Sequence, residues 1–232
     1  MGKKKESNTS FLVQGTILAA ASMISRIIGL IYRIPLTAIL GDTGNNYYAS
    51  AFKIYNILLI ISSYSLPLAV SKLVSANISQ GRRRNVYRIL KCSLIFGAVS
   101  GLAAAAVLFF GAETITNLMR TPLSIFAVET LVPVLFIMAI LGVLRGFFQG
   151  LGTMMPSAMS HILEQIANAV MSVWAAYMLF SHGLKVGAVL GDAEEYAAAY
   201  GAAGGTIGTG TGALVALLFS MFVLFAYLRS FK

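Results

Sequence analysis

Charged residues are scarce in this chain. Asp, Glu, Lys and Arg make up 11% of its 232 residues, whereas a soluble domain carries roughly 25%. Hydrophobic residues reach 58%, and the mean hydropathy is +0.81. So little charge excludes an ordinary soluble domain and indicates that lipid surrounds much of the chain. The chain has one cysteine, Cys92, which excludes an internal disulfide.

Catalytic and metal-binding patterns are also missing from the sequence. The histidines His161 and His182 lack the spacing of metal ligands, and no nucleophile elbow or zinc-protease motif occurs. The glycine-rich run at 205–212 lacks the Gly-Lys-Ser/Thr ending of a phosphate loop. We therefore expect no enzyme and no cofactor. The net charge of +9 falls mostly between apolar stretches, which indicates membrane topology rather than binding of nucleic acid.

Long apolar stretches are abundant, and six of them can cross the hydrocarbon core of a bilayer as helices. They cover residues of about 11–40, 47–76, 89–111, 123–150, 156–180 and 203–228, after a basic N-terminus at 1–10. Turn-forming residues at 41–46 are expected to close the first hairpin as a loop. The segment 183–200 is expected to be an exposed extracellular element. The predicted fold is an all-α polytopic membrane protein with six transmembrane helices.

Lys and Arg are distributed unevenly between the two sides of this predicted bundle. With the N-terminus inside, the connectors and termini place ten cations inside and two, Arg120 and Lys185, outside. The inside set is Lys3, Lys4, Lys5, Arg82, Arg83, Arg84, Arg88, Lys91, Arg229 and Lys232. This asymmetry predicts that both termini are cytoplasmic. A lipid-headgroup or phosphate site is the alternative interpretation of the cluster at 82–91, and topology is the simpler one.

Glycines recur at four-residue spacing on three of the predicted helices. The sets are Gly142, Gly146 and Gly150; Gly97 and Gly101; and Gly204, Gly208 and Gly212. Small residues at this spacing let helix backbones approach closely in lipid. Pro35 and Pro67 fall inside apolar stretches, where each removes a backbone donor and can bend its helix.

Ionisable side chains inside the predicted spans mark candidate functional positions, because they are costly in lipid. They are Arg26, Arg33, Lys53, Lys72, Glu129, Arg145 and Glu164. Arg26 and Arg33 are seven residues apart, so both leave the same face of their helix. We expect Glu129 to lie near Arg33 and Lys53 as a counter-ion, and Arg145 to pair with Glu164.

Apart from Lys72, which can reach the inner interface, these residues comprise four cations and two anions. An excess of cations suits an anionic substrate, and the arginine fork matches phosphate. The alternative interpretation is that Arg33 and Lys53 reach outward to the interface and that the other charges form structural pairs.

Several segments resemble one known family. They are FLVQGTIL at 11–18, SRIIGLIYRIPL at 25–36, residues 55–69, and RGFFQG at 145–150. These resemble the stage V sporulation protein B and YtgP-like polysaccharide transporters. That group belongs to the multidrug/oligosaccharidyl-lipid/polysaccharide exporter superfamily, alongside the lipid II flippases. Asn46, Leu59 and Ile60 depart from the lipid II flippases, which carry charged residues at these positions.

The resemblance implies a flippase that moves undecaprenyl-diphosphate-linked saccharides across a bacterial plasma membrane by alternating access between two six-helix lobes. Arg26, Arg33 and Lys53 would bind the substrate. Residues 11–232 would form one lobe, with the second lobe absent, so that the partner is either a missing C-terminal lobe or a second half-length chain. The alternatives are a cation-coupled multidrug exporter and a non-transporting scaffold in envelope or spore assembly. Which saccharide is carried stays open.

Overall fold

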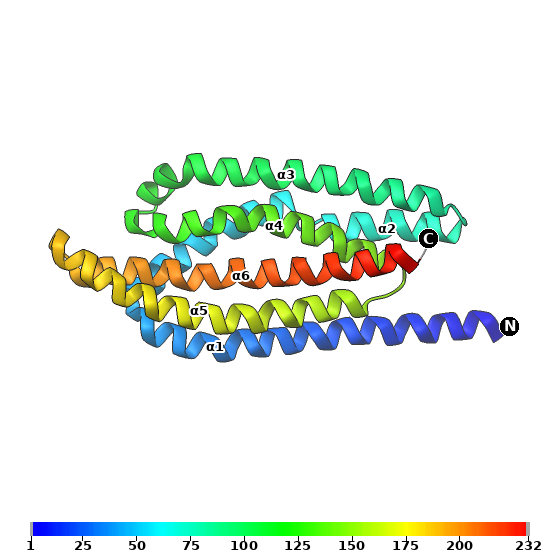
Figure 1. Ribbon diagram of the computed structural model, residues 1–232, viewed down its shortest axis with the longest axis horizontal. Coiled ribbons are helices and arrows are strands. Elements are labelled where there is room, and N and C mark those ends of the chain that lie inside the picture. Colours follow the sequence, from blue (N-terminus) through cyan, green and yellow to red (C-terminus); the bar gives the residue numbers. More distant parts are fainter. Residues whose placement is uncertain (1, 231–232) are drawn as a thin grey trace.

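The protein is an elongated bundle of helices, described here from a computed structural model (Figure 1). The structure describes the backbone of residues 2–230 and the side chains of residues 13–229. Its elements are α1 (Gly2–Ser62), α2 (Leu66–Ser79), α3 (Arg83–Leu118), the short 3-10 helix η1 (Pro122–Ser124), α4 (Ile125–Gly150), α5 (Met155–Leu190) and α6 (Ala193–Ser230). Every regular element in this part of the chain is a helix, so the predicted all-α class is confirmed.

Gly41 divides α1 into two antiparallel arms. The apolar stretch Val13–Ser79 has 67 residues, roughly 100 Å if it were one straight helix. Gly41 has φ 61° and ψ −171°, a conformation essentially restricted to glycine. The side-chain amide of Asn45 donates to the carbonyl oxygen of Gly41 at 2.7 Å and holds the turn. The first hairpin is therefore closed within 41–46, as expected, but by Gly41 alone, and helix resumes directly after it.

The second arm of α1 is interrupted before it reaches the opposite end of the bundle. Helix stops at Ser62 and α2 begins at Leu66, with Pro67 in its first turn. Proline fits the first turn of a helix because its missing donor is not needed there. The predicted continuous helix at 47–76 is therefore two helices. The two arms on either side of Gly41 and the four further apolar helices correspond to the six predicted crossings.

The glycine rows lie where helices meet most closely, as predicted. A Cβ atom on Gly146 of α4 would lie 2.5 Å from the carbonyl oxygen of Pro67 in α2. A Cβ atom on Gly212 of α6 would lie 2.5 Å from the carbonyl oxygen of Glu164 in α5. Gly101 likewise meets the backbone of α4. Backbone-to-backbone contact of this kind is how helices associate in lipid, where no hydrophobic force acts between them.

Helices α5 and α6 extend beyond the other helices as a hairpin (Figure 1). The segment 183–200, expected to be an exposed extracellular element, is helical, because α5 continues to Leu190 and α6 begins at Ala193. It is exposed only in part, since Ala197 and Ala199 are buried. Gly191 makes the turn with φ 95°. The hairpin is tied back to α1, since the Tyr47 hydroxyl donates to Glu195 Oε1 at 2.7 Å.

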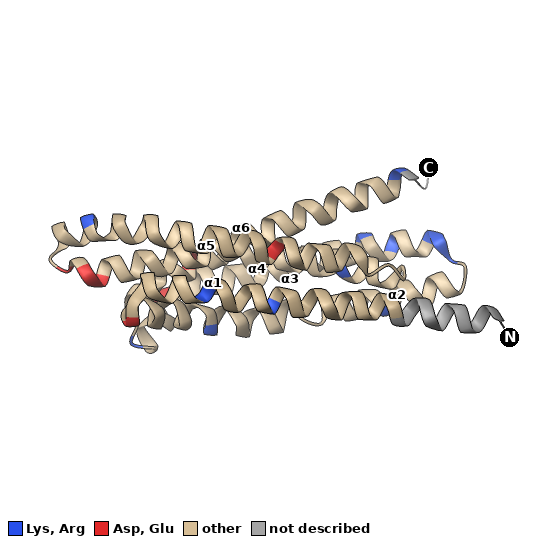
Figure 2. Cartoon of the chain, turned by 90° about the horizontal axis from the view of Figure 1, so that it is seen from below, with Lys and Arg blue, Asp and Glu red and all other residues tan. Residues whose placement is uncertain are grey.

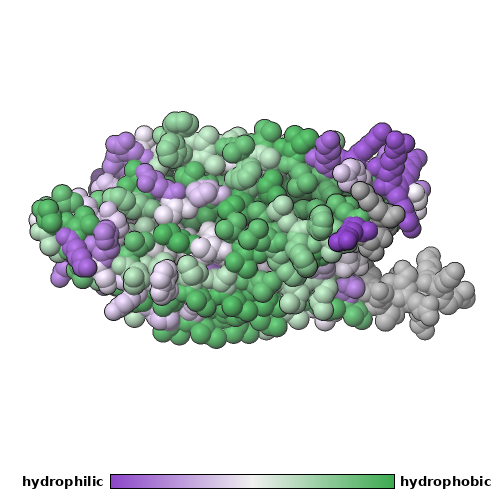
Figure 3. All heavy atoms as spheres, viewed as in Figure 1, coloured by the Kyte–Doolittle hydropathy of each residue, from purple (hydrophilic) through white to green (hydrophobic). Residues whose placement is uncertain are grey.

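Polar and apolar surfaces are segregated along the bundle. Lys and Arg residues gather at the end where the described chain begins and ends, and Asp and Glu residues gather mainly at the other (Figure 2). An apolar band separates these ends (Figure 3). Five helices in the described part are long and apolar enough to cross a membrane, so the chain is a multi-pass membrane protein. The predicted basic residues at 1–10, and Lys232, lie outside the described side chains.

Candidate functional site

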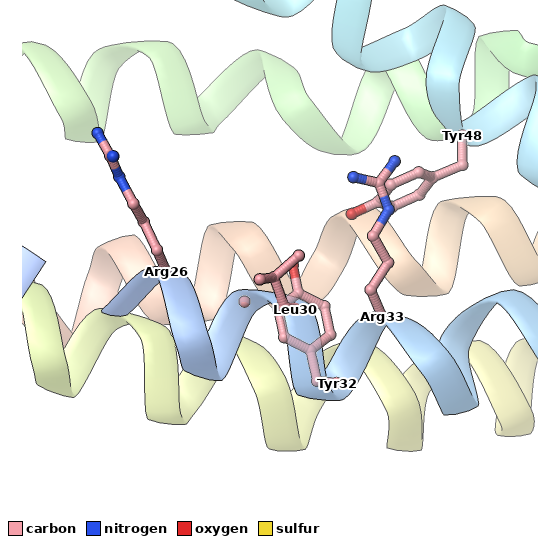
Figure 4. A pocket seen from close by; sticks show the side chains of 6 residues that line it. Arg26, Leu30, Tyr32, Arg33 and Tyr48 are labelled. Atoms are coloured by element: carbon pink, nitrogen blue, oxygen red, sulfur yellow. The ribbon is translucent and has the colours of Figure 1, made fainter. Parts of the chain in front are cut away.

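A cationic pocket lies between the two arms of α1. It has a volume of about 420 Å³ and is lined by Arg26, Gly29, Leu30, Tyr32, Arg33 and Tyr48. The two arginines project from the same face of the first arm, and Tyr48 reaches in from the second arm (Figure 4). The structure therefore brings together the arginine pair that the sequence indicated. Among the described residues, neither arginine forms an ion pair.

Arg26 lies deep within the apolar span. It is 15 residues before the turn at Gly41, roughly 22 Å along the helix axis, while Arg33 is roughly 12 Å from that turn. Both side chains are exposed on the surface of this chain. An uncompensated arginine at such depth is costly when it faces lipid. Its exposure here therefore indicates that this face lines a wet cavity or receives a charged group.

A chain of hydrogen bonds from α5 and α6 holds the aromatic wall of the pocket. The Asn168 amide donates to the Tyr32 hydroxyl at 3.2 Å. The Ser172 hydroxyl lies 2.8 Å from Asn168 Oδ1 and 2.8 Å from the Gly205 carbonyl oxygen, within reach to donate to either. Tyr32 and Tyr48 both line the pocket with Arg33. The position of the pocket wall is thus coupled to the contact between α5 and α6.

Two residues that were expected at the site lie elsewhere. Lys53 is exposed on the second arm of α1 and is not among the residues lining the pocket. Glu129 of α4 is also exposed, and among the described residues no ion pair joins it to Arg33 or Lys53. A shared depth in the membrane does not bring side chains together when their helices present them in different directions. The pocket consequently keeps an unbalanced positive charge.

Arg145 of α4 and Glu164 of α5 form an ion pair inside the bundle, as predicted. Arg145 Nη2 donates to Glu164 Oε2 at 2.6 Å, and the two side chains are 7% and 14% exposed. Arg145 Nε also donates to Ser160 Oγ at 2.8 Å. Arg145 is enclosed because every residue from Leu141 to Phe148 is buried. These charges neutralise each other between α4 and α5, so they do not balance the charge of Arg26 and Arg33.

Sequence reasoning missed the residues that form and support the aromatic wall of the pocket, namely Tyr32, Tyr48 and Asn168. A pattern pointing to Asn168 was present, because Glu164, Asn168 and Ser172 recur every four residues along an apolar helix. Such a polar stripe predicts a hydrogen-bonded contact with a neighbouring helix. Tyr48 gave no comparable signal, since an aromatic residue near a helix end is also typical of the membrane interface.

Comparison with curated proteins gives relatives from Bacillus subtilis. The chain is 31% identical over 227 residues to stage V sporulation protein B of Bacillus subtilis (strain 168), covering 96% of this chain and 40% of the relative. It is 29% identical over 212 residues to the lipid II flippase MurJ of the same organism, covering 86% of this chain and 38% of MurJ. The uncharacterized membrane protein YabM of that organism is 29% identical over 209 residues, covering 90% of this chain and 36% of YabM. The chain thus spans about two fifths of the length of these relatives.

No solved structure gives a significant match to the chain. The family model described as polysaccharide biosynthesis protein matches residues 12–231. This match covers nearly all of the helical bundle, including both arms of α1, the cationic pocket and the glycine-packed helices α4 to α6. The chain therefore belongs to the polysaccharide biosynthesis protein family.

Proposed function

We propose that this chain forms one six-helix lobe of a flippase that carries undecaprenyl-diphosphate-linked saccharides across the bacterial plasma membrane, with both termini in the cytoplasm. The observation that carries the proposal is the pair of arginines, Arg26 and Arg33, exposed on one face of α1 within the membrane span. The similarity to a lipid II flippase supports it, as does the family of polysaccharide biosynthesis proteins.

The chemistry of the pocket suits a diphosphate. A guanidinium group is planar, stays charged and donates in a fork that matches phosphate oxygens. Tyr32 and Tyr48 add hydroxyl groups beside Arg33. A cationic drug, in contrast, would be repelled by two arginines without a carboxylate partner among the described residues. The cation-coupled drug exporter is therefore the weaker alternative.

The two arginines provide two successive binding positions for the diphosphate headgroup. They are seven residues apart, roughly 10 Å along the helix, so a diphosphate that moves toward the Gly41 turn passes from Arg26 to Arg33. The polyprenyl tail stays in lipid beside the exposed apolar face of α1. Alternating access requires a second lobe that rocks against the first around the substrate. That lobe would be supplied by the part of the relatives that this chain does not span, or by a second copy of the chain.

The test is native mass spectrometry of lipids that co-purify with the full-length protein. We expect the wild type to retain a polyprenyl-diphosphate saccharide, and an Arg26→Ala/Arg33→Ala variant to lose it. The matched control is Arg120→Ala/Lys185→Ala, which removes the same charge from exposed positions outside the pocket. This control should keep the lipid.

The outcomes separate the competing functions. Loss of the lipid in the pocket variant alone supports the flippase and identifies its cargo by mass. If the pocket variant retains the lipid as well as the wild type does, or if the wild type holds no such lipid, the cationic pocket is not a substrate site. A scaffold in envelope or spore assembly would then be the better function, since it needs only the packed helices.

A further inference from the structure

A second cationic pocket lies on the outer face of α3, away from the pocket between the arms of α1. It has a volume of about 550 Å³ and is lined by Arg84, Tyr87, Arg88, Lys91 and Cys92. All five side chains are exposed. Among the described residues, no acidic side chain forms an ion pair with these three cations. Three positive charges therefore converge on one hollow without an internal counter-ion.

The periodicity of α3 places this pocket on one stripe of the helix. Val86 and Leu90 are 7% and 3% exposed and pack inward with Val70 and Val74 of α2 in a buried cluster. Positions 84, 87, 88 and 91 follow the spacing of one helical face and turn outward. The basic residues are thus held on a packed helix rather than on a loose connector.

The same stripe becomes apolar immediately after the cations. Ile95, Phe96, Val99 and Leu102 continue it and are 57%, 62%, 63% and 57% exposed. Lys91 and Ile95 are one helical turn apart, roughly 6 Å along the axis. A positively charged hollow followed by an exposed apolar track has the polarity of an amphiphile with an anionic head and an acyl chain.

The length of α3 sets the depth of the hollow in the membrane. The helix has 36 residues, roughly 54 Å, which exceeds the about 30 Å hydrocarbon core. Its basic first turns lie at the end of the bundle where Lys and Arg gather (Figure 2). This position corresponds to the headgroup layer, while Ile95 to Leu102 lie at the level of the acyl chains.

We propose that this pocket is a binding site for an anionic phospholipid, with the phosphate held by Arg84, Arg88 and Lys91, the glycerol region against Tyr87, and one acyl chain along Ile95 and Val99. Clusters of basic residues next to a membrane span attract anionic lipids. A zwitterionic lipid presents its own cation to this cluster and binds less well. The site is independent of the proposed flippase substrate and does not rest on that function.

The test measures lipid binding to the full-length protein by native mass spectrometry in mild detergent. The protein is titrated separately with phosphatidylglycerol and with phosphatidylethanolamine. We expect the first bound phosphatidylglycerol to be held about tenfold more tightly than phosphatidylethanolamine, because three cations act on one phosphate. The pocket variant Arg84→Gln/Arg88→Gln/Lys91→Gln should lose that preference.

A matched control removes the same charge from the same end of the bundle. Lys72→Gln/Arg82→Gln/Arg229→Gln changes three exposed cations outside the hollow and should keep the preference within about twofold. Equal weakening in both triple variants would show a general effect of charge and overturn the site. An unchanged preference in the pocket variant would do the same. Complete displacement of the lipid by inorganic phosphate would show a soluble-anion site instead, whereas retention supports the phospholipid.

Discussion

Replacing Gly146 by alanine tests whether close helix contact, rather than helix propensity, sets the stability of this bundle. The added Cβ atom would lie 2.5 Å from the Pro67 carbonyl oxygen and 2.7 Å from its Cα atom, where ordinary contact begins near 3.4 Å. Helix α2 must therefore withdraw by about 0.9 Å. The obstacle is backbone, so no side-chain rotation can relieve it.

The magnitude follows from two opposing effects. Overpacking of a close contact costs about 1–3 kcal/mol, and replacing glycine by alanine inside a helix returns about 0.5–1 kcal/mol. We expect Gly146→Ala to lower the free energy of unfolding by about 1–2 kcal/mol. Gly15→Ala is the matched control, since its Cβ atom meets nothing within 4 Å, and it should stabilise the protein slightly.

The assay is equilibrium unfolding of the full-length protein in mild detergent, followed by circular dichroism, with both variants measured beside the wild type. The difference between the two alanine variants isolates the steric cost, because the change in helix propensity is common to both. If Gly146→Ala is as stable as Gly15→Ala, then α2 and α4 do not meet through their backbones as described, and the reasoning about the glycine rows is refuted.

Three further perturbations test other features. Glu164→Gln should cost about 3 kcal/mol of unfolding free energy because it leaves Arg145 buried without its counter-ion, while Arg145→Met/Glu164→Leu should recover most of that loss; a double variant less stable than the single one would contradict this. Gly41→Ala should cost about 1–3 kcal/mol through backbone strain alone, since no atom lies within 4 Å of the new Cβ, and an unchanged melting temperature would contradict the turn. Asn168→Ala should weaken retention of a polyprenyl diphosphate roughly threefold by releasing Tyr32, and retention equal to the wild type would show that the tether has no role.

The membrane-spanning helices could be predicted from the sequence because a bilayer requires long apolar stretches. The apolar stretches correspond to helices long enough to cross the membrane. The glycines at four-residue spacing correspond to close contacts between those helices. The interruption of the helix before Leu66 was predicted in part, since Pro67 indicated a bend. The extension of α5 and α6 beyond the other helices was not predicted, because hydropathy indicates only contact with lipid. Gly183 and Gly187 of α5 instead stabilise this hairpin by packing closely against α6.

The candidate site was predictable only in its charged part. Arg26 and Arg33 share a face through the helix period alone, so their common orientation follows from spacing. Lys53 and Glu129 were placed by depth, and depth does not determine the direction in which a side chain leaves its helix. The hydrogen-bonded support from Asn168 depends on how α5 meets α1; the polar stripe Glu164, Asn168 and Ser172 predicts a helix contact but does not say which helix or residue it meets.

The reversal at Gly41 has a consequence for biogenesis. All six residues that line the arginine pocket fall between positions 26 and 48, so the helical hairpin made by the two arms of α1 contains the whole lining by itself. Contacts that are local in sequence form early and quickly. The pocket therefore takes shape as the two arms insert, and Asn168 fixes it only when α5 arrives. A substitution at Gly41 should thus lower the yield of inserted protein, whereas one at Asn168 should leave the yield unchanged and weaken only the later packing of α5 against α1.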